Sequence, residues 1–279
     1  MSERQRLDAR LVSEGLASGR EKAKELIADG QVQVNGKTVT KPSFAVSPQD
    51  TVISLQGEPR FVGRGGWKLE KALSLYHPSL DGMTAADIGS STGGFTQCML
   101  QHGAEKVFAV DVGRDQLHSV LRQDSRVVCM EQTDIRDTEK ISQRIENGSL
   151  DFAATDVSFI SLRLVVPSIC ALLKDGAPFV CLIKPQFEAG RKALDKHGVV
   201  RDVADHRRVL SEITLFLASC RLSVEHLDPS PVRGGDGNIE YLAVTRYHPQ
   251  EEVLPLADTA IDQAILQAEQ TLNFPKIGR

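Results

Sequence analysis

The pattern of apolar and polar residues along this chain changes character near residue 58. Before that point, apolar residues recur at helical spacing in two short segments and then alternate with polar residues in two more. The expected elements are helices over residues 6–14 and 19–29, a hairpin over 32–39 around Asn35-Gly36, and an extended segment over 45–55. Together they indicate a small α+β domain over residues 1–58.

Beyond residue 66, short apolar runs alternate with amphipathic segments. The expected strands cover residues 85–88, 106–110, 127–130, 151–155, 177–183, 222–227 and 239–246. The expected helices cover residues 67–75, 94–101, 114–121, 162–173, 203–219 and 256–271. This alternation predicts a doubly wound α/β sheet, mostly parallel, whose last two strands pair antiparallel because only a loop joins them. We expect this domain to span residues 67–279, after a basic linker over residues 59–66.

Composition narrows the possible functions. The 279 residues carry a net charge of -4, so any contact with RNA must come from local basic patches. The five cysteines include no C-x-x-C pair, which indicates reduced thiols and predicts no metal site. The charged segment 1–10 lacks the apolar core of a signal peptide, and Lys174 and Asp175 interrupt the most apolar region. We therefore expect no membrane span and a cytoplasmic location.

A glycine-rich loop follows the first strand of the second domain, from Asp87 to Gly94. The free N–H groups at the start of the next helix make such a loop a cradle for a ligand. Its spacing does not match the dinucleotide fingerprint, and it lacks the Gly-Lys-Ser/Thr of a phosphate loop. Asp111 closes the next strand and could hold ribose hydroxyls. A glycine-rich turn without a ligand, and a nicotinamide enzyme, remain alternative interpretations.

The order acid-x-Gly-x-x-x-Gly-Gly, followed by a second acid, resembles the S-adenosylmethionine loop of class I methyltransferases. This resemblance implies a Rossmann-like sheet with an antiparallel last strand. It also implies that S-adenosylmethionine is the cofactor. The residues implied to bind it are Asp87, Gly89, Ser91, Thr92, Gly93, Gly94, Asp111 and Asp134.

Four ionisable residues are expected at one rim of the sheet. Asp156 and Lys184 follow predicted parallel strands, whose carboxyl ends are where ligands bind in such folds. Glu240 begins the antiparallel strand, and Lys68 lies in the first turn of the helix before the first strand. The topology therefore places all four beside the glycine-rich loop. Each alone is more typical of a surface charge or an ion pair.

The set Lys68, Asp156, Lys184 and Glu240 resembles the tetrad of FtsJ-like ribose 2′-O-methyltransferases. The resemblance implies that Lys184 activates the ribose 2′-hydroxyl, whose proton must leave as the oxygen attacks the methyl group. It also implies that Asp156 and Lys68 orient that lysine and set its charge, while Glu240 completes the network.

The first domain resembles the RNA-binding domain named after small-subunit ribosomal protein S-four. The resemblance is carried by Arg-Leu-Asp-x-x-Leu, Ser-Gly-Arg-Glu and Gly-x-Val-x-Val-Asn-Gly, which occur in that order. Such domains recognise RNA shape and phosphates more than sequence. The implied RNA-facing residues are Arg6, Arg20, Lys22 and Lys24, to which we add Arg64 of the linker. A solvated, charge-balanced face is the alternative, because acidic residues interleave with these cations.

Longer motifs connect the two domains to one family. The segments GRGGWKLE, DVSFIS, KPQFE and G-x-GN-x-EY resemble those of the TlyA family, and the resemblance extends from Arg6 to about Tyr247. It implies methylation of cytidine ribose in ribosomal RNA, with ribosomal RNA or ribosomal subunits as the partner. Relatives in this family are often named hemolysins, so a membrane-lytic protein remains an alternative. A non-catalytic RNA-binding factor for ribosome assembly is another.

Overall fold

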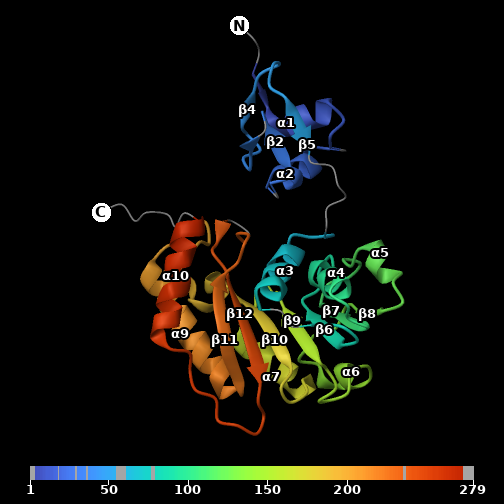
Figure 1. Ribbon diagram of the computed structural model, residues 1–279, viewed down its shortest axis with the longest axis vertical. Helices are drawn as coiled ribbons and strands as arrows, with labels where there is room; N and C mark the ends of the chain where they lie inside the picture. The colour runs from blue at the N-terminus through green and yellow to red at the C-terminus, as the bar shows by residue number, and fades with distance from the viewer. Residues whose placement is uncertain are drawn as a thin grey trace. The chain divides into compact units, whose positions relative to one another are not determined.

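The chain folds into two compact units, Met1–Arg60 and Phe61–Arg279, drawn in Figure 1. The computed structural model describes residues 4–17, 19–28, 30–35, 37–54, 61–76, 79–234 and 237–272. Gly36 of the expected hairpin turn, residues 59–60 of the expected linker and Gly235 of the last motif lie outside these ranges.

The first unit is the small α+β domain that the sequence predicts. Its helices are α1 (Leu7–Ser13) and α2 (Arg20–Ala28). The strand β2 (Val32–Val34) pairs antiparallel with β3 (Lys37–Thr38) and β5 (Val52–Ser54), while β1 (Gln5–Arg6) pairs with β4 (Ala45–Val46). The apolar residues at helical and alternating spacing meet in one core, formed by Leu7, Leu11, Ala23, Ile27, Val32, Val34 and Val46.

The second unit is built on a seven-stranded sheet with the order β11-β12-β10-β9-β6-β7-β8. Its strands are β6 (Thr84–Ile88), β7 (Lys106–Val110), β8 (Val127–Met130), β9 (Phe152–Thr155), β10 (Pro178–Ile183), β11 (Leu222–Pro229) and β12 (Tyr241–Tyr247). The pairs among β6 to β10 are parallel, and β12 runs antiparallel to both β10 and β11. The expected doubly wound sheet with an antiparallel last strand is confirmed.

Helices cover both faces of this sheet, as Figure 1 shows. Successive residues of a strand point to opposite faces, so Phe179 and Cys181 of β10 enter one core while Val180 and Leu182 enter the other. The first core is closed by α6 (Thr138–Ser142), α7 (Leu162–Leu172), α9 (Val203–Ser219) and α10 (Asp258–Leu272). The second core is closed by α3 (Gly65–Tyr76), α4 (Gly94–Gln101) and α5 (Ser119–Arg122).

Several short elements differ from the prediction. The helix expected over residues 114–121 is only α5, because the carboxylate of Glu131 accepts hydrogen bonds from the backbone N–H groups of residues 115–117 and holds them in a loop. The helices α6 and α8 (Pro185–Glu188) and the 3₁₀ turn Arg191–Ala193 were not expected. They are too short to show a helical period.

The start of the second unit also differs from the expected linker. Helix α3 begins at Gly65, and Phe61 is buried in the second core. A side chain at Gly66 would collide with the Phe61 ring, which explains the glycine at this position. Residues 61–66 therefore lie within the second unit. Among the described residues, no helix is long and apolar enough to cross a membrane.

Candidate active site at the carboxyl edge of the sheet

The strand register brings three of the four expected rim residues together. Ile183 of β10 is paired with Tyr241 of β12, so Lys184 and Glu240, the next residues outward, are neighbours at the edge of the sheet. Asp156 follows β9, the strand on the other side of β10. The first turn of α3 adds Lys68.

These four side chains form a connected network. Lys68 Nζ lies 3.0 Å from Asp156 Oδ2 and 2.8 Å from Glu240 Oε2. Lys184 Nζ lies 2.7 Å from Asp156 Oδ1, the other oxygen of the same carboxylate. The structure therefore brings together the four residues that the topology placed at this rim, with Asp156 bridging the two lysines.

The network is largely withdrawn from water. Lys68 and Lys184 are 7% and 6% exposed, and Glu240 is 2% exposed. Burial lowers the pKa of Lys68, but the charges and hydrogen bonds of Asp156 and Glu240 outweigh it and hold that pKa above its usual value. Lys68 is therefore a fixed ammonium group at neutral pH.

Two further polar residues complete the network, and the sequence analysis did not single them out. Lys184 Nζ donates to Ser158 Oγ at 2.9 Å, and Gln186 Nε2 donates to Glu240 Oε1 at 3.2 Å. Ser158 lies two residues after Asp156, on the loop beyond β9, and Gln186 lies two residues after Lys184, in α8. The sequence offered one indication of them, because Ser158 lies in the motif DVSFIS and Gln186 in the motif KPQFE.

Two adjoining cavities open at this edge. The first has a volume of about 650 Å³ and is lined by all four tetrad residues. The second, of about 510 Å³, lies over the ends of β6, β7 and β8. Residues that line both cavities are Gly89, Ser91, Asp156, Ser158 and Phe159. A ligand of nucleoside size or larger could extend from one cavity into the other.

The first cavity contains buried polar atoms that lack partners among the described residues. Asp87 is fully buried, and its Oδ2 accepts hydrogen bonds from the Thr96 backbone N–H and hydroxyl at 2.8 and 2.7 Å. Asp87 Oδ1, Ser90 Oγ and Gln186 Oε1 have no such partner. Burial raises the pKa of Asp87 to about 7, although the hydrogen bonds from Thr96 oppose this shift. Such atoms favour a ligand that brings a positive charge or hydrogen-bond donors.

The residues expected to bind the cofactor are divided between the cavities. Thr92 and Gly94 line the first cavity, whereas Asp111 and Asp134 line the second. Gly93 lines neither cavity. Its φ of 96° turns the chain into α4, and a side chain there would collide with Leu121.

The two acids of the second cavity already have partners. Asp111 accepts from the backbone N–H groups of Ser91 and Gly113 at 2.8 and 2.7 Å, so it ties the glycine-rich loop to the end of β7. Asp134 accepts a forked pair of hydrogen bonds from Arg136, which lowers the pKa of Asp134.

Phe159 is a second feature that the sequence analysis missed. This residue is 91% exposed and adopts a φ of 63°, which is uncommon for a residue with a bulky side chain. Its ring centroid lies 5.1 Å from that of Phe187, and it lines both cavities. A large apolar ring at the mouth of a polar site offers a stacking surface for a planar ligand.

The cations expected to face RNA are exposed but paired. Arg6 and Arg20 both approach the buried Asp8, with N–O distances of 2.8 and 3.7 Å. On α2, Lys22 pairs with Glu25 and Lys24 with Glu21, at 3.2 and 2.6 Å. Arg64, in the second unit, is exposed and lines the first cavity.

Both units match known protein families. The FtsJ-like methyltransferase family matches residues 61–247, and the S4 domain matches residues 5–52. The chain is 44% identical over 277 residues to a Bacillus subtilis protein named as a candidate rRNA methyltransferase, covering 99% of this chain and 98% of that one.

Two other relatives extend the comparison. A Mycobacterium tuberculosis protein named 16S/23S rRNA (cytidine-2′-O)-methyltransferase TlyA is 37% identical over 242 residues, covering 86% of this chain and 89% of that one. A solved Streptococcus thermophilus structure, named as a candidate hemolysin, is 39% identical with a TM-score of 0.74 and covers 98% of both chains. Matches to both units, at these identities and over nearly the whole length, show that the chain belongs to the TlyA family of FtsJ-like methyltransferases.

Proposed function

We propose that the protein transfers a methyl group from S-adenosylmethionine to the 2′-hydroxyl of a cytidine in ribosomal RNA. The observation that carries this proposal is the buried network of Lys68, Asp156, Lys184 and Glu240 on the wall of a polar cavity. Two relatives are named rRNA (cytidine-2′-O)-methyltransferases, which supports cytidine as the modified nucleoside and ribosomal RNA as the substrate.

The donor set of the cavities fits S-adenosylmethionine. Asp87 Oδ1 is a buried carboxylate oxygen without a partner among the described residues, and it suits the cationic amino-acid end of the cofactor. Asp111 and Asp134 line the neighbouring cavity, where they can accept hydrogen bonds from the hydroxyls of a ribose. When bound, S-adenosylmethionine supplies an electrophilic methyl group.

The tetrad performs the chemistry on the acceptor side. The 2′-hydroxyl must lose its proton as the oxygen–methyl bond forms. We assign Lys184 Nζ, in contact with Asp156 Oδ1 and Ser158 Oγ, to receive it, a role that requires Lys184 to be the neutral amine when the hydroxyl is in place. Lys68 stays protonated between Asp156 and Glu240 and fixes the orientation of the Asp156 carboxylate. Accurate positioning of the two reactants accounts for much of the rate, because effective molarities can reach about 10⁵–10⁸ M.

Two features of the rim suit an RNA substrate. The exposed ring of Phe159 can stack on a nucleobase, a contact worth about 1–3 kcal/mol per base. Arg64 lines the same cavity and can contact a phosphate. A single nucleotide drawn out of its stack could therefore reach the tetrad.

The test is transfer of tritiated methyl from S-adenosylmethionine to ribosomal subunits purified from a strain that lacks the gene. Wild type and Lys184→Ala are compared with Lys174→Ala, a control at the opposite edge of the sheet, where Lys174 pairs with Asp151. We expect label on ribose with wild type and Lys174→Ala. We expect a loss of at least about a hundredfold with Lys184→Ala, because acid–base catalysis typically contributes about 10²–10⁴-fold.

Absence of label on either subunit or on intact ribosomes, with cofactor binding established separately, would contradict the proposal for these substrates. Full cellular function of Lys184→Ala would instead support an RNA-binding assembly factor. Release of dye from liposomes by low concentrations of the pure protein would support the membrane-lytic alternative.

A further inference from the structure

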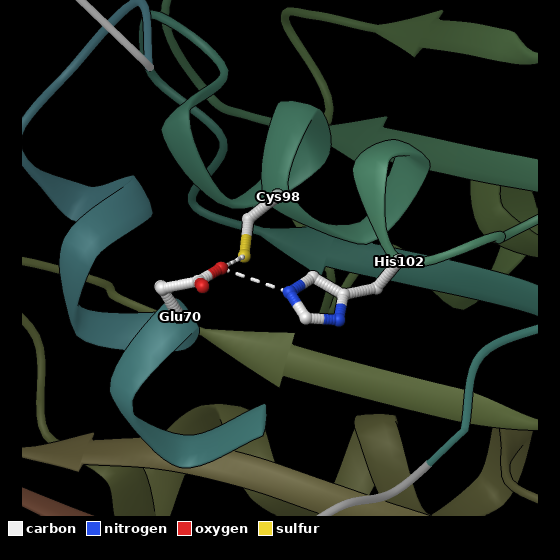
Figure 2. A group of neighbouring side chains, drawn as sticks. All are labelled: Glu70, Cys98 and His102. Carbon is white, nitrogen blue, oxygen red and sulfur yellow. Dashed lines mark hydrogen bonds and ion pairs between the residues drawn. The ribbon is translucent and has the colours of Figure 1, made fainter. Parts of the chain in front are cut away.

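A cluster of three ligand-type side chains connects α3 to α4. Figure 2 shows Glu70 of α3 pointing toward Cys98 and His102, which come from α4 and the residue that ends it. Glu70 Oε2 lies 2.8 Å from His102 Nε2 and 3.7 Å from Cys98 Sγ. One ligand atom from each residue lies within 4.8 Å of the other two. None of the three lines either cavity described above, so the cluster is separate from the methyl-transfer site.

The three atoms are those that Zn²⁺ prefers. Zinc binds thiolate sulfur at about 2.3 Å and imidazole nitrogen and carboxylate oxygen at about 2.0–2.2 Å, in tetrahedral geometry. These lengths place ligand atoms roughly 3.3–3.7 Å apart. The sulfur–oxygen distance already falls there, and the nitrogen–oxygen distance needs only a small opening. A fourth position remains for water.

The helix geometry also favours a cation. Cys98 and His102 are four residues apart, so they project from the same side of one helix. They lie in and just after the last turn of α4, where the unpaired carbonyl groups give the helix end a partial negative charge. The expectation of no metal rested on the missing C-x-x-C pair, a pattern that does not include this cysteine and histidine.

Burial protects the thiol while leaving access for an ion. Cys98 is buried in the core, whereas the side chains of His102 and Glu70 are 29% and 15% exposed. Bonds to the metal would replace the two hydrogen bonds that Glu70 Oε2 now makes. On binding, Cys98 gives up its thiol proton to solvent, and neutral His102 carries its remaining proton on Nδ1 so that Nε2 can coordinate the ion.

We propose that Glu70, Cys98 and His102 form a Zn²⁺ site that fastens α3 to α4. Glu70 lies two residues after Lys68 on α3, and α4 begins at Gly94 of the glycine-rich loop. The ion therefore joins the helix that carries Lys68 to the helix that follows the glycine-rich loop. Because it binds the folded state, it stabilises the second unit.

The experiment uses the full-length reduced protein after treatment with a chelator. Zn²⁺ alone is titrated against a chromophoric competitor, the melting temperature is recorded, and Co²⁺ is used as a spectroscopic substitute. We expect one equivalent of Zn²⁺, a rise in melting temperature that saturates at that point, and a thiolate-to-cobalt absorption band.

The variants separate this site from adventitious binding. His102→Gln leaves the buried thiol in the core, and we expect it to weaken Zn²⁺ binding by about a hundredfold or more, since even loss of an outer-shell partner costs about 10–100-fold. Cys98→Ala should abolish the cobalt band. Cys129→Ala removes a thiol outside the cluster and should change neither result.

Equal Zn²⁺ affinity in His102→Gln and wild type, or a Co²⁺ complex without a thiolate band, would overturn the proposal. The cluster would then be a hydrogen-bonded contact between two helices. Because no readout depends on methyl transfer, failure of this proposal is distinguishable from failure of the proposed function.

Discussion

At the scale of single residues, Asp156 connects the parts of the network. Each oxygen of its carboxylate contacts a different lysine, Lys68 on one side and Lys184 on the other. Removing one partner of a buried ion pair leaves an uncompensated charge, which costs about 3–5 kcal/mol. The positions of the two lysines are thus coupled through one side chain.

If Asp87 contacts the cofactor as proposed, we expect cofactor binding to depend on pH. Its pKa in the folded protein is about 7, mainly because of burial, so a large fraction is protonated below that pH. A bound cation favours the carboxylate and lowers this pKa, so binding releases a proton wherever the free protein carries one. We expect S-adenosylmethionine affinity to fall as the pH drops below about 7, by up to about tenfold per unit, and to level off above it. Calorimetry in two buffers of different ionisation enthalpy measures the released proton.

Asp87→Asn provides the control, because it removes the titrating group. We expect weaker binding and a flat dependence on pH across the same range. The same titration affects stability. Between pH 3.8, the ordinary pKa of an aspartate, and about pH 7, Asp87 holds a proton in the folded state that it loses in the unfolded state. The contribution of Asp87 to the free energy of unfolding therefore falls as the pH rises through this range. An affinity in wild type that does not change across pH 7 would rule out the role of Asp87.

At the scale of elements, the loops after β9 and β10 are clamped together by Glu188 of α8. Its Oε2 accepts from Ser161 Oγ at 2.7 Å, and its Oε1 accepts from the backbone N–H of Leu162 at 2.8 Å. Leu162 is the first residue of α7, so the carboxylate also caps that helix. The clamp holds the loop that carries Ser158 and Phe159 against the loop that carries Lys184.

Glu188→Gln tests this clamp. The amide keeps the shape but loses the charge, so we expect the free energy of unfolding to fall by about 1–2 kcal/mol, as for the loss of a helix cap or a charged hydrogen bond. We also expect kcat to fall about tenfold while S-adenosylmethionine affinity stays unchanged, because the clamp acts on the acceptor side. Denaturant unfolding and methyl-transfer kinetics measure the two effects.

Two other variants are compared with Glu188→Gln. Glu212→Gln removes an exposed carboxylate on α9 that pairs with Arg208, and it should change the free energy of unfolding by less than about 0.5 kcal/mol. Phe159→Ala should raise KM for the RNA with little change in stability, since its ring is exposed. A kcat of Glu188→Gln equal to wild type would show that the clamp supports the fold alone.

The elements also show which parts of the structure were predictable. Lys68, Asp156, Lys184 and Glu240 could be placed together because the doubly wound topology fixes which strand ends share an edge, whatever the loops do. The short helix α8 could not be predicted, since four residues beginning at a proline show no helical period. Its position also depends on the hydrogen bond between Glu188 and Ser161, which are far apart in the sequence. Ser158 and Gln186 were missed because their roles arise from contacts with distant residues that no sequence period records.

At the scale of the whole molecule, one chain joins an S4 domain to a methyltransferase domain. The net charge of -4 gives no general attraction to RNA, so binding depends on local groups. Covalent linkage makes engagement of the second domain effectively intramolecular once the first has bound. An S4 domain that binds RNA would therefore raise the local concentration of substrate at the tetrad.

In the first unit, Arg6, Arg20, Lys22 and Lys24 are the cations expected to contact RNA. Lys22 and Lys24 pair with exposed glutamates, and exposed ion pairs are worth only about 0–1 kcal/mol, so phosphates can displace these partners. Arg6 and Arg20 are themselves exposed, so they can contact a phosphate while they remain near the buried Asp8. We expect replacement of all four by alanine to make the plot of log affinity against log salt shallower by about 3, at about 0.7–0.9 per phosphate contact. Filter binding of ribosomal RNA across a salt series measures this slope.

The same variant should bind S-adenosylmethionine with wild-type affinity, because none of the four residues lines either cavity. Lys174→Ala removes one lysine outside the first unit; it serves as a control and should leave the salt dependence unchanged. If the slopes of wild type and the fourfold variant coincide, these cations form a solvated face, and the phosphate contacts must come from the second unit. Arg64, an exposed cation that lines the same cavity as the tetrad, would then be the first residue to replace.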